Sequence, residues 1–226
     1  MANNRKTTTE KIVVDYFSDV LCVWAWIGQP RVEELQKQWG EEIELRYRFV
    51  DVFGDARSKI TGKYGAENGF EDFHEHIVHA ASGFEAASIH PDTWTRIRPR
   101  SSLQAQLVLK AAQLLEQAEQ AEHLALEIRR AFFARGEDIA ELEVLLGLAE
   151  SAGLDRQAID GKLRDGAAIA ALSSDLRMAS GLGVKGSPTW VLNQGRQVLY
   201  GNVGYRILSA NIEELLAKPG GDTSWC

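Results

Sequence analysis

Ile12-Val13-Val14-Asp15-Tyr16-Phe17 is a short run of β-branched and aromatic residues, a composition typical of a strand. Over residues 24–39 apolar side chains recur at helical spacing, and Gly40 is a natural end for that helix. Residues 43–49 then alternate apolar and charged side chains, which predicts a second strand. A strand–helix–strand order favours two parallel strands, because the helix carries the chain back to the same end of the sheet.

The rest of the chain divides into a helical block and a return to β-structure. Residues 101–181 show amphipathic helical patterns, with Ser101 or Ser102, Asp138 and Asp155 as candidate helix caps and Gly181 as the last stop. Residues 189–192 and 197–200 predict a hairpin, and a final helix follows over 205–217. Residues 54–99 predict loops with one helix around 71–81.

Composition excludes several classes of function. The 226 residues carry a net charge of −7, which argues against a broad nucleic-acid surface. No apolar stretch approaches the ~20 residues of a membrane-spanning helix, and the polar N-terminus lacks a signal-peptide core. We therefore expect a cytoplasmic protein with no membrane partner. Its two cysteines, Cys22 and Cys226, do not make a disulfide scaffold, so each needs its own explanation.

The order βαβ, helical block, ββα resembles an α/β thioredoxin fold that carries a large helical insertion. Residues 1–54 and 182–226 would form the core, and residues 55–181 the insertion. The segment Cys22-Val23-Trp24-Ala25-Trp26-Ile27-Gly28 resembles the Cys-Pro-Trp-Cys-Tyr-Ile-Gly active site of FrnE-type oxidoreductases of the DsbA-like family. The segment 183–189 resembles the cis-proline loop of that superfamily. Gly201-Asn202 resembles a loop of 2-hydroxychromene-2-carboxylate isomerases and kappa-class glutathione transferases.

Cys22 is the candidate reactive thiol. It follows a predicted strand and opens a predicted helix, where amide groups and the helix dipole favour a thiolate, so we expect a lowered pKa. The alternative is a small buried apolar residue. The resemblance favours reactivity, but Ala25 stands where FrnE-type proteins have a second cysteine. A Cys-x-x-Cys disulfide is therefore impossible at this site.

Three routes remain for Cys22 without a neighbouring thiol. Glutathione could resolve a mixed disulfide on Cys22, or Cys22 could bind glutathione without redox chemistry, as serine does at this position in the isomerase and transferase relatives. In the third route Cys226 is the resolving thiol. It lies eight residues past Lys218, a reach of at most ~26–29 Å, against a final helix of roughly 20 Å. Cys226 could thus approach Cys22 of its own chain or of a partner in a homodimer, or it could be an idle end.

Further site residues follow from the resemblance. It implies that Pro188 is cis and faces Cys22, and that the backbone of Ser187 pairs with a peptide or with glutathione as an added strand. Asn202 is a candidate for the polar end of glutathione, or simply part of a turn. Trp24 and Ala25 are candidate substrate contacts beside the thiol, whereas core packing is favoured for Trp26.

The histidines His74, His76 and His79 do not follow a zinc-binding pattern, so no metal site is expected. We interpret them as a polar helix face that lines a cleft between the insertion and the core.

Three hypotheses for function remain open. The first is a monothiol thiol-disulfide oxidoreductase that acts through Cys22 on a small thiol or a disulfide-bearing substrate. The second is a glutathione-dependent isomerase or transferase for small aromatic or electrophilic compounds, with the helices forming its pocket. The third is a redox-inactive thioredoxin-fold module that serves as a chaperone or adaptor.

Overall fold

A four-stranded mixed sheet forms the centre of the computed structural model, which describes residues 11–218. The strands are β1 (Ile12–Ser18), β2 (Ile43–Phe49), β3 (Thr189–Leu192) and β4 (Gln197–Tyr200), in the order β2-β1-β3-β4. β1 runs parallel to β2, with Ile12 opposite Ile43, and the pairs β1–β3 and β3–β4 are antiparallel. The parallel pair and the hairpin predicted from the sequence are both confirmed. The chain therefore has the thioredoxin-like α/β fold.

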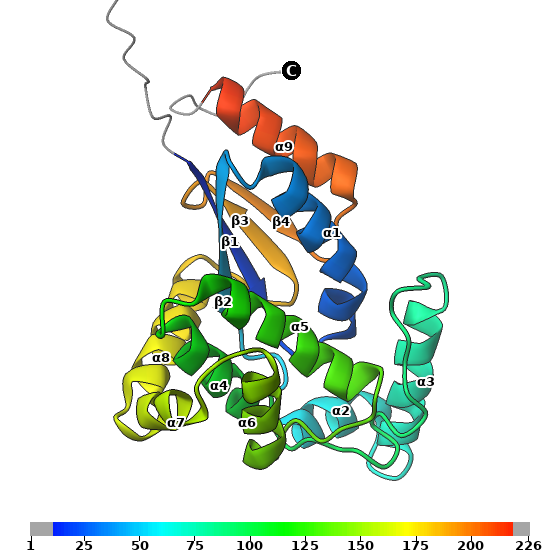
Figure 1. Ribbon diagram of the computed structural model, residues 1–226. Coiled ribbons are helices and arrows are strands. Elements are labelled where there is room, and N and C mark those ends of the chain that lie inside the picture. The colour runs from blue at the N-terminus through cyan, green and yellow to red at the C-terminus, as the bar shows by residue number, and fades with distance from the viewer. Residues whose placement is uncertain (1–10, 219–226) are drawn as a thin grey trace, which may run out of the picture.

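One face of the sheet is covered by α1 (Val23–Trp39) and α9 (Tyr205–Ala217), which lie side by side in Figure 1. Their apolar sides pack against Tyr16 of β1 and Trp190 of β3, and the two ring centroids are 4.3 Å apart. This cluster fixes the axis of α1 relative to β1. The first turn of α1 is thereby held beside the end of β1.

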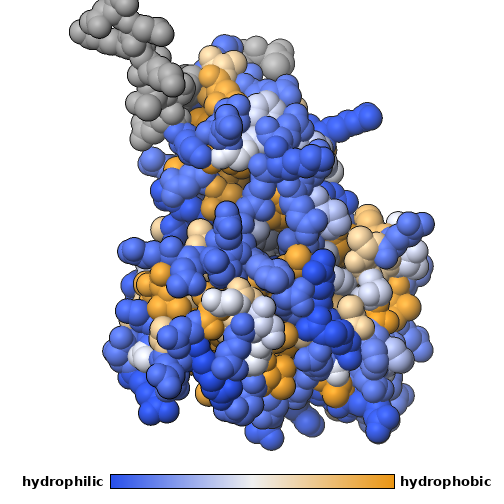
Figure 2. Space-filling model, in the orientation of Figure 1, coloured by the Kyte–Doolittle hydropathy of each residue, from blue (hydrophilic) through white to orange (hydrophobic). Residues whose placement is uncertain are grey.

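Helices from the middle of the chain form the lower half of the molecule in Figure 1. They are α2 (Ala56–Tyr64), α3 (Gly69–Ala81), α4 (Leu103–Gln113), α5 (Ala118–Phe133), α6 (Leu142–Ser151), α7 (Arg156–Arg164) and α8 (Ala167–Gly181). On the face shown in Figure 2, hydrophilic side chains cover most of these helices, and apolar side chains show between them. A large buried apolar cluster joins them to residues 20–27 at the start of α1. Because this cluster spans both parts, the division at residues 54/55 and 181/182 stays a prediction.

A buried group of charges also ties the helices to the sheet. Asp175 of α8 accepts from Lys110 of α4 at 2.5 Å and from Arg48 of β2 at 3.1 Å. It accepts from the backbone N–H of Phe49 as well. Arg48 reaches Asp15 of β1 at 2.9 Å on its other side. One carboxylate therefore connects α4, α8 and the edge of the sheet.

Two elements differ from the sequence-based expectation. Residues 56–64 form α2 rather than a loop; the helix buries only Ala56 and Ile60, so its apolar periodicity is weak. Its one local signal is Asp55, which accepts from the N–H of Ser58 as an N-cap. Asp138 does not cap α6, because its carboxylate accepts from Ala140 in a turn and the helix begins at Leu142. Within residues 11–218 no helix has the length and apolar character needed to cross a membrane.

Candidate active site around Cys22

Cys22 lies at the N-cap of α1, directly after the loop that leaves β1. Its backbone N–H donates to Asp19, and its carbonyl accepts from Ala25 and Trp26, which opens the helix. The side chain is only 6% exposed. The thiol donates to the backbone carbonyl of Ser187, with Sγ 3.1 Å from the oxygen. Cys22 and the loop before β3 are therefore in direct contact.

The loop before β3 is held by hydrogen bonds to its neighbours. The Ser187–Pro188 peptide bond is cis, and the Pro188 carbonyl accepts from the N–H of Gly201 at 2.8 Å. The hydroxyl of Ser187 accepts from the N–H of Asp19, also at 2.8 Å. The two loops that carry Cys22 and Ser187 thus support each other from positions far apart in the sequence.

Asp19 is an organising residue that the sequence reasoning missed. Its fully buried carboxylate accepts from the N–H groups of Leu21, Val52 and Phe53 and from the hydroxyl of Ser102. Burial raises the pKa of this carboxyl, and the hydrogen bonds act in the opposite direction. The bond to Leu21 is a local turn that the sequence could have suggested. The other donors come from distant segments and were not accessible to sequence reasoning.

The expected low pKa of Cys22 is wrong. Burial in the apolar cluster raises the pKa of the thiol. The side-chain hydroxyl of Ser187 and the amides of Ala25 and Trp24 lower it by less, and the Asp19 carboxylate raises it further. A helix N-terminus favours a thiolate only where its field outweighs the loss of hydration, and here it does not. At rest Cys22 is a thiol that donates to Ser187.

A cavity of about 200 Å³ opens beside Cys22 and Ser187. Its apolar wall includes Trp24, which is 37% exposed, and Phe53. Further lining side chains come from the helices, from the loop before β3 and from the end of β4: Lys59, Ile60, Lys63, Tyr64, Phe73, His76, Lys185 and Tyr200. The helical part and the sheet thus each contribute one side of the cavity.

Three lysines line this cavity, although the protein as a whole is acidic. Lys59 and Lys63 come from α2, and Lys185 comes from the loop before β3. Within residues 11–218 none of these lysines has a carboxylate at ion-pair distance, and the Nζ of Lys63 lies 5.1 Å from the centroid of the Tyr64 ring. The arrangement suits a ligand that carries carboxylates close to a sulfur atom.

The histidines of α3 have separate surroundings. His76 lines the cavity, in agreement with the interpretation of a polar face at a cleft, and burial together with Lys63 lowers its pKa. His74 instead uses Nδ1 to contact the carbonyl of Thr93 at 2.7 Å. Across the described part of the chain, no cluster of three or more metal-ligating side chains is present.

The structure brings some predicted site residues together and separates others. Cys22, Trp24 and Ser187 line the cavity, and Pro188 follows Ser187 directly. Ala25 is fully buried and does not line it. Asn202 accepts from the guanidinium of Arg31 and does not line the cavity either. Cys226 lies outside the described residues.

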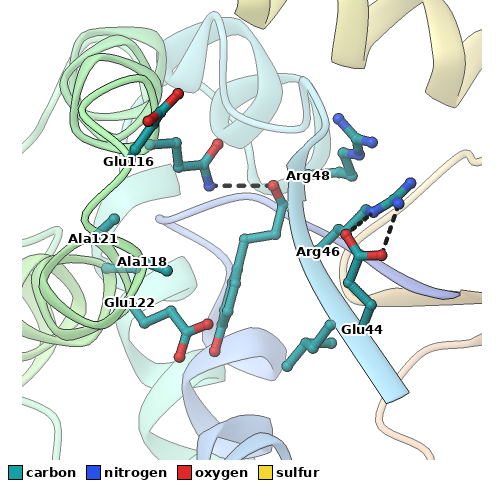
Figure 3. A pocket seen from close by; sticks show the side chains of 11 residues that line it. Glu44, Arg46, Arg48, Glu116, Ala118, Ala121 and Glu122 are labelled. Carbon is teal, nitrogen blue, oxygen red and sulfur yellow. Dashed lines mark hydrogen bonds and ion pairs between the residues drawn. The ribbon is translucent and has the colours of Figure 1, made fainter. Parts of the chain in front are cut away.

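A second hollow, of about 380 Å³, lies at the edge of the sheet between β2 and the α4–α5 connection (Figure 3). In this view Glu44 and Arg46 of β2 form a bidentate ion pair. Glu116 and Glu122 lie on the opposite side, on the α4–α5 turn and on α5. It shares no lining residue with the Cys22 cavity and contains no thiol. Of the two, only the smaller cavity contains the candidate thiol of Cys22.

Comparison with known proteins places this geometry in a family. The chain is 26% identical over 227 residues to the ClpXP adapter protein SpxH of Halalkalibacterium halodurans, an alignment that covers 96% of this chain and 72% of that protein. It is 24% identical to the SpxH of Shouchella clausii, of whose length it spans 60%. A putative protein disulfide isomerase from Nitrosomonas europaea superposes with a TM-score of 0.79 at 17% identity, over 93% of this chain and all of that one.

The cytosolic disulfide reductase DsbM from Pseudomonas aeruginosa superposes with a TM-score of 0.68 at 23% identity, over 91% of this chain and 98% of that one. At these identities the two superpositions show the fold alone. The sequence profile of the DSBA-like thioredoxin domain matches residues 13–213, nearly the whole chain. Together with the strand order and the loop that faces Cys22, this match shows that the chain belongs to the DSBA-like thioredoxin domain family.

Proposed function

We propose that this protein is a thiol-disulfide oxidoreductase that works through the single thiol of Cys22, with glutathione as co-substrate in a reducing compartment. The observation that carries the proposal is the position of Cys22 at a cavity lined by three lysines without carboxylate partners in the described chain. Glutathione carries two carboxylates and a thiol, so its charges complement this lining. Ala25 removes the usual second thiol, and an external thiol has to take its place.

The reaction balances with glutathione as the only reductant. Cys22 loses its proton to solvent, and its thiolate attacks the glutathione sulfur of a mixed disulfide. A bond forms between Cys22 and glutathione, and the substrate sulfur leaves and takes up a proton. A second glutathione thiolate then attacks the Cys22 adduct. Oxidised glutathione is released, and Cys22 is free again.

The neighbouring residues have distinct roles in this scheme. The backbone of Ser187, held by the cis bond to Pro188 and by Asp19, positions the substrate chain beside the Cys22 sulfur. The amides of Trp24 and Ala25 lower the pKa of Cys22 and stabilise the thiolate once it forms. Lys59, Lys63 and Lys185 hold the carboxylates of glutathione.

The decisive experiment is intact-mass analysis after exposure to oxidised glutathione, followed by digestion to locate the adduct. We expect one glutathione on Cys22, retained in Cys226→Ser and lost in Cys22→Ser. A Cys22 that carries no glutathione after this treatment would contradict the proposal. A Cys22–Cys226 bond would make the tail cysteine the resolving thiol instead of glutathione. Turnover of an aromatic substrate that survives in Cys22→Ser would point to isomerase chemistry.

A second candidate function is that of an adaptor without catalysis. Two observations favour it: the two curated relatives described above are named adapter proteins, and burial raises the pKa of Cys22. In that case Cys22 would be a packing residue, and Cys22→Ser would keep every binding activity of the protein. Formation of the glutathione adduct at Cys22 separates the two candidates.

A further inference from the structure

A third hollow adjoins the Cys22 cavity along β4. We call it the β4 hollow. It has a volume of about 370 Å³ and is lined by Gly183, Val184, Lys185, Thr189, Val198 and Tyr200. Lys185 and Tyr200 line both this hollow and the Cys22 cavity. A ligand with its sulfur at Cys22 can therefore extend past these two residues into the β4 hollow.

The β4 hollow has an apolar surface that the fold leaves uncovered. Tyr200 is 69% exposed and Val198 is 48% exposed. Their side chains share one face of β4, because alternate residues of a strand point to the same side. The Tyr200 ring lies over Gly186, where an added Cβ would stand 2.5 Å from the phenolic oxygen. The backbone before the cis bond and the apolar surface thus form one continuous wall.

β4 also offers backbone groups. It is the last strand in the order β2-β1-β3-β4, so its outer edge has no strand partner within residues 11–218. An extended polypeptide can pair with such an edge, whereas a small disulfide makes no use of it. Lys185, which has no carboxylate partner there, adds a preference for an acidic side chain at the junction of the two cavities.

We propose that the β4 hollow binds the polypeptide that flanks the reacting cysteine of a protein substrate. An apolar side chain near that cysteine packs on Val198 and Tyr200, and a neighbouring carboxylate pairs with Lys185. This inference rests on thiol exchange at Cys22. It adds the class of substrate: an acidic, cysteine-bearing segment of a protein, present as a mixed disulfide with glutathione. The sulfur chemistry is the exchange already described, with the glutathione half in the Cys22 cavity.

The first test measures binding without chemistry, in the full-length chain carrying Cys22→Ser. Two short fluorescent peptides, each with one reduced cysteine, are compared by anisotropy. In one peptide leucine and glutamate flank the cysteine, and in the other glycine and lysine do. We expect the first to bind about tenfold more tightly, a difference of about 1.4 kcal/mol. Equal affinities would overturn the proposal.

The second test uses variants at the surface. Val198→Asp places a like charge against the acidic peptide and should weaken its binding about tenfold. The control is Ile207→Asp, an equally exposed apolar position on α9 that lines neither cavity, which should change nothing. Circular dichroism checks folding, and Val198→Ala replaces Val198→Asp should the charge prevent folding, with a smaller loss expected. Full binding in the folded Val198 variant would overturn the proposal.

The same variants separate this inference from the proposed function. With Cys22 intact, Val198→Asp should lower kcat/KM about tenfold for the glutathionylated leucine–glutamate peptide and leave adduct formation with oxidised glutathione unchanged. If the adduct forms on Cys22 but Val198→Asp leaves kcat/KM for the peptide unchanged, the proposed function holds and the role of the β4 hollow is contradicted. Selective peptide binding without any adduct on Cys22 would support the hollow as an adaptor surface and remove the oxidoreductase.

Discussion

Cys22 is subject to two opposing physical influences. The first amides of α1 favour its thiolate, and burial among apolar side chains favours its thiol. Burial is the larger influence, and the proton is used in a hydrogen bond to Ser187. The resting site is therefore protonated. In the proposed exchange, a substrate displaces this bond.

The pH dependence of alkylation tests this description of Cys22. In a Cys226→Ser background, we expect the rate of Cys22 alkylation to rise with pH and to reach its midpoint above that of the same chain unfolded in urea. The sign follows from the raised pKa, because less thiolate is present at any given pH in the folded protein. A midpoint below that of the unfolded chain would show that the helix field dominates after all.

Among the secondary-structure elements, the packing of α4 and α8 against the sheet depends on the carboxylate of Asp175. Its carboxylate is 1% exposed, forms ion pairs with Lys110 and Arg48, and accepts a hydrogen bond from the N–H of Phe49. Burial lowers the pKa of Lys110, and Asp175 partly restores it. Removing the carboxylate leaves a buried ammonium without its partner, which is costly.

We expect Asp175→Ala to lower the free energy of unfolding by about 3–5 kcal/mol, the range for breaking a buried ion pair from one side. The double variant Lys110→Met, Asp175→Leu should lose markedly less, because it buries no unpaired charge. Urea unfolding followed by circular dichroism measures both. A double variant as unstable as the single one would show that the carboxylate acts through Phe49 and Arg48 rather than through Lys110.

Across the whole molecule, the local distribution of charge matters more for the binding of an anionic ligand than the net charge does. The net charge of −7 would repel glutathione, which is an anion. The side chains of Lys59, Lys63 and Lys185 nevertheless line the cavity that contains Cys22. α2 supplies the first two and the loop before β3 supplies the third, so the local field exists only in the folded chain.

We expect the double variant Lys59→Gln, Lys63→Gln to raise the KM for a glutathionylated substrate several-fold and to weaken the dependence of kcat/KM on ionic strength. The matched control is Lys37→Gln, at the far end of α1 beside Glu34, which should change neither quantity. Initial rates from low to high salt provide the measurement. Equal salt dependence in all three proteins would exclude a role for the α2 lysines in binding.

Local patterns in the sequence correctly predicted the βαβ start, the hairpin, the last helix and the place of Cys22 at a helix N-terminus. These follow from local periodicity and from turn residues, which act between neighbours in the chain. It did not reveal α2, since a helix with two buried residues carries almost no periodic signal. Nor did it reveal that the Asp19 carboxylate accepts hydrogen bonds from residues 52, 53 and 102.

The protonation of the thiol and the surroundings of the site depend on tertiary packing instead. The pKa of Cys22 depends on how much water reaches the sulfur, and that is set by packing among segments distant in sequence. The lysines of the cavity and the β4 hollow likewise arise where α2, the loop before β3 and β4 meet. Burial and charge proximity are properties of three-dimensional contact, so no pattern along the chain specifies them.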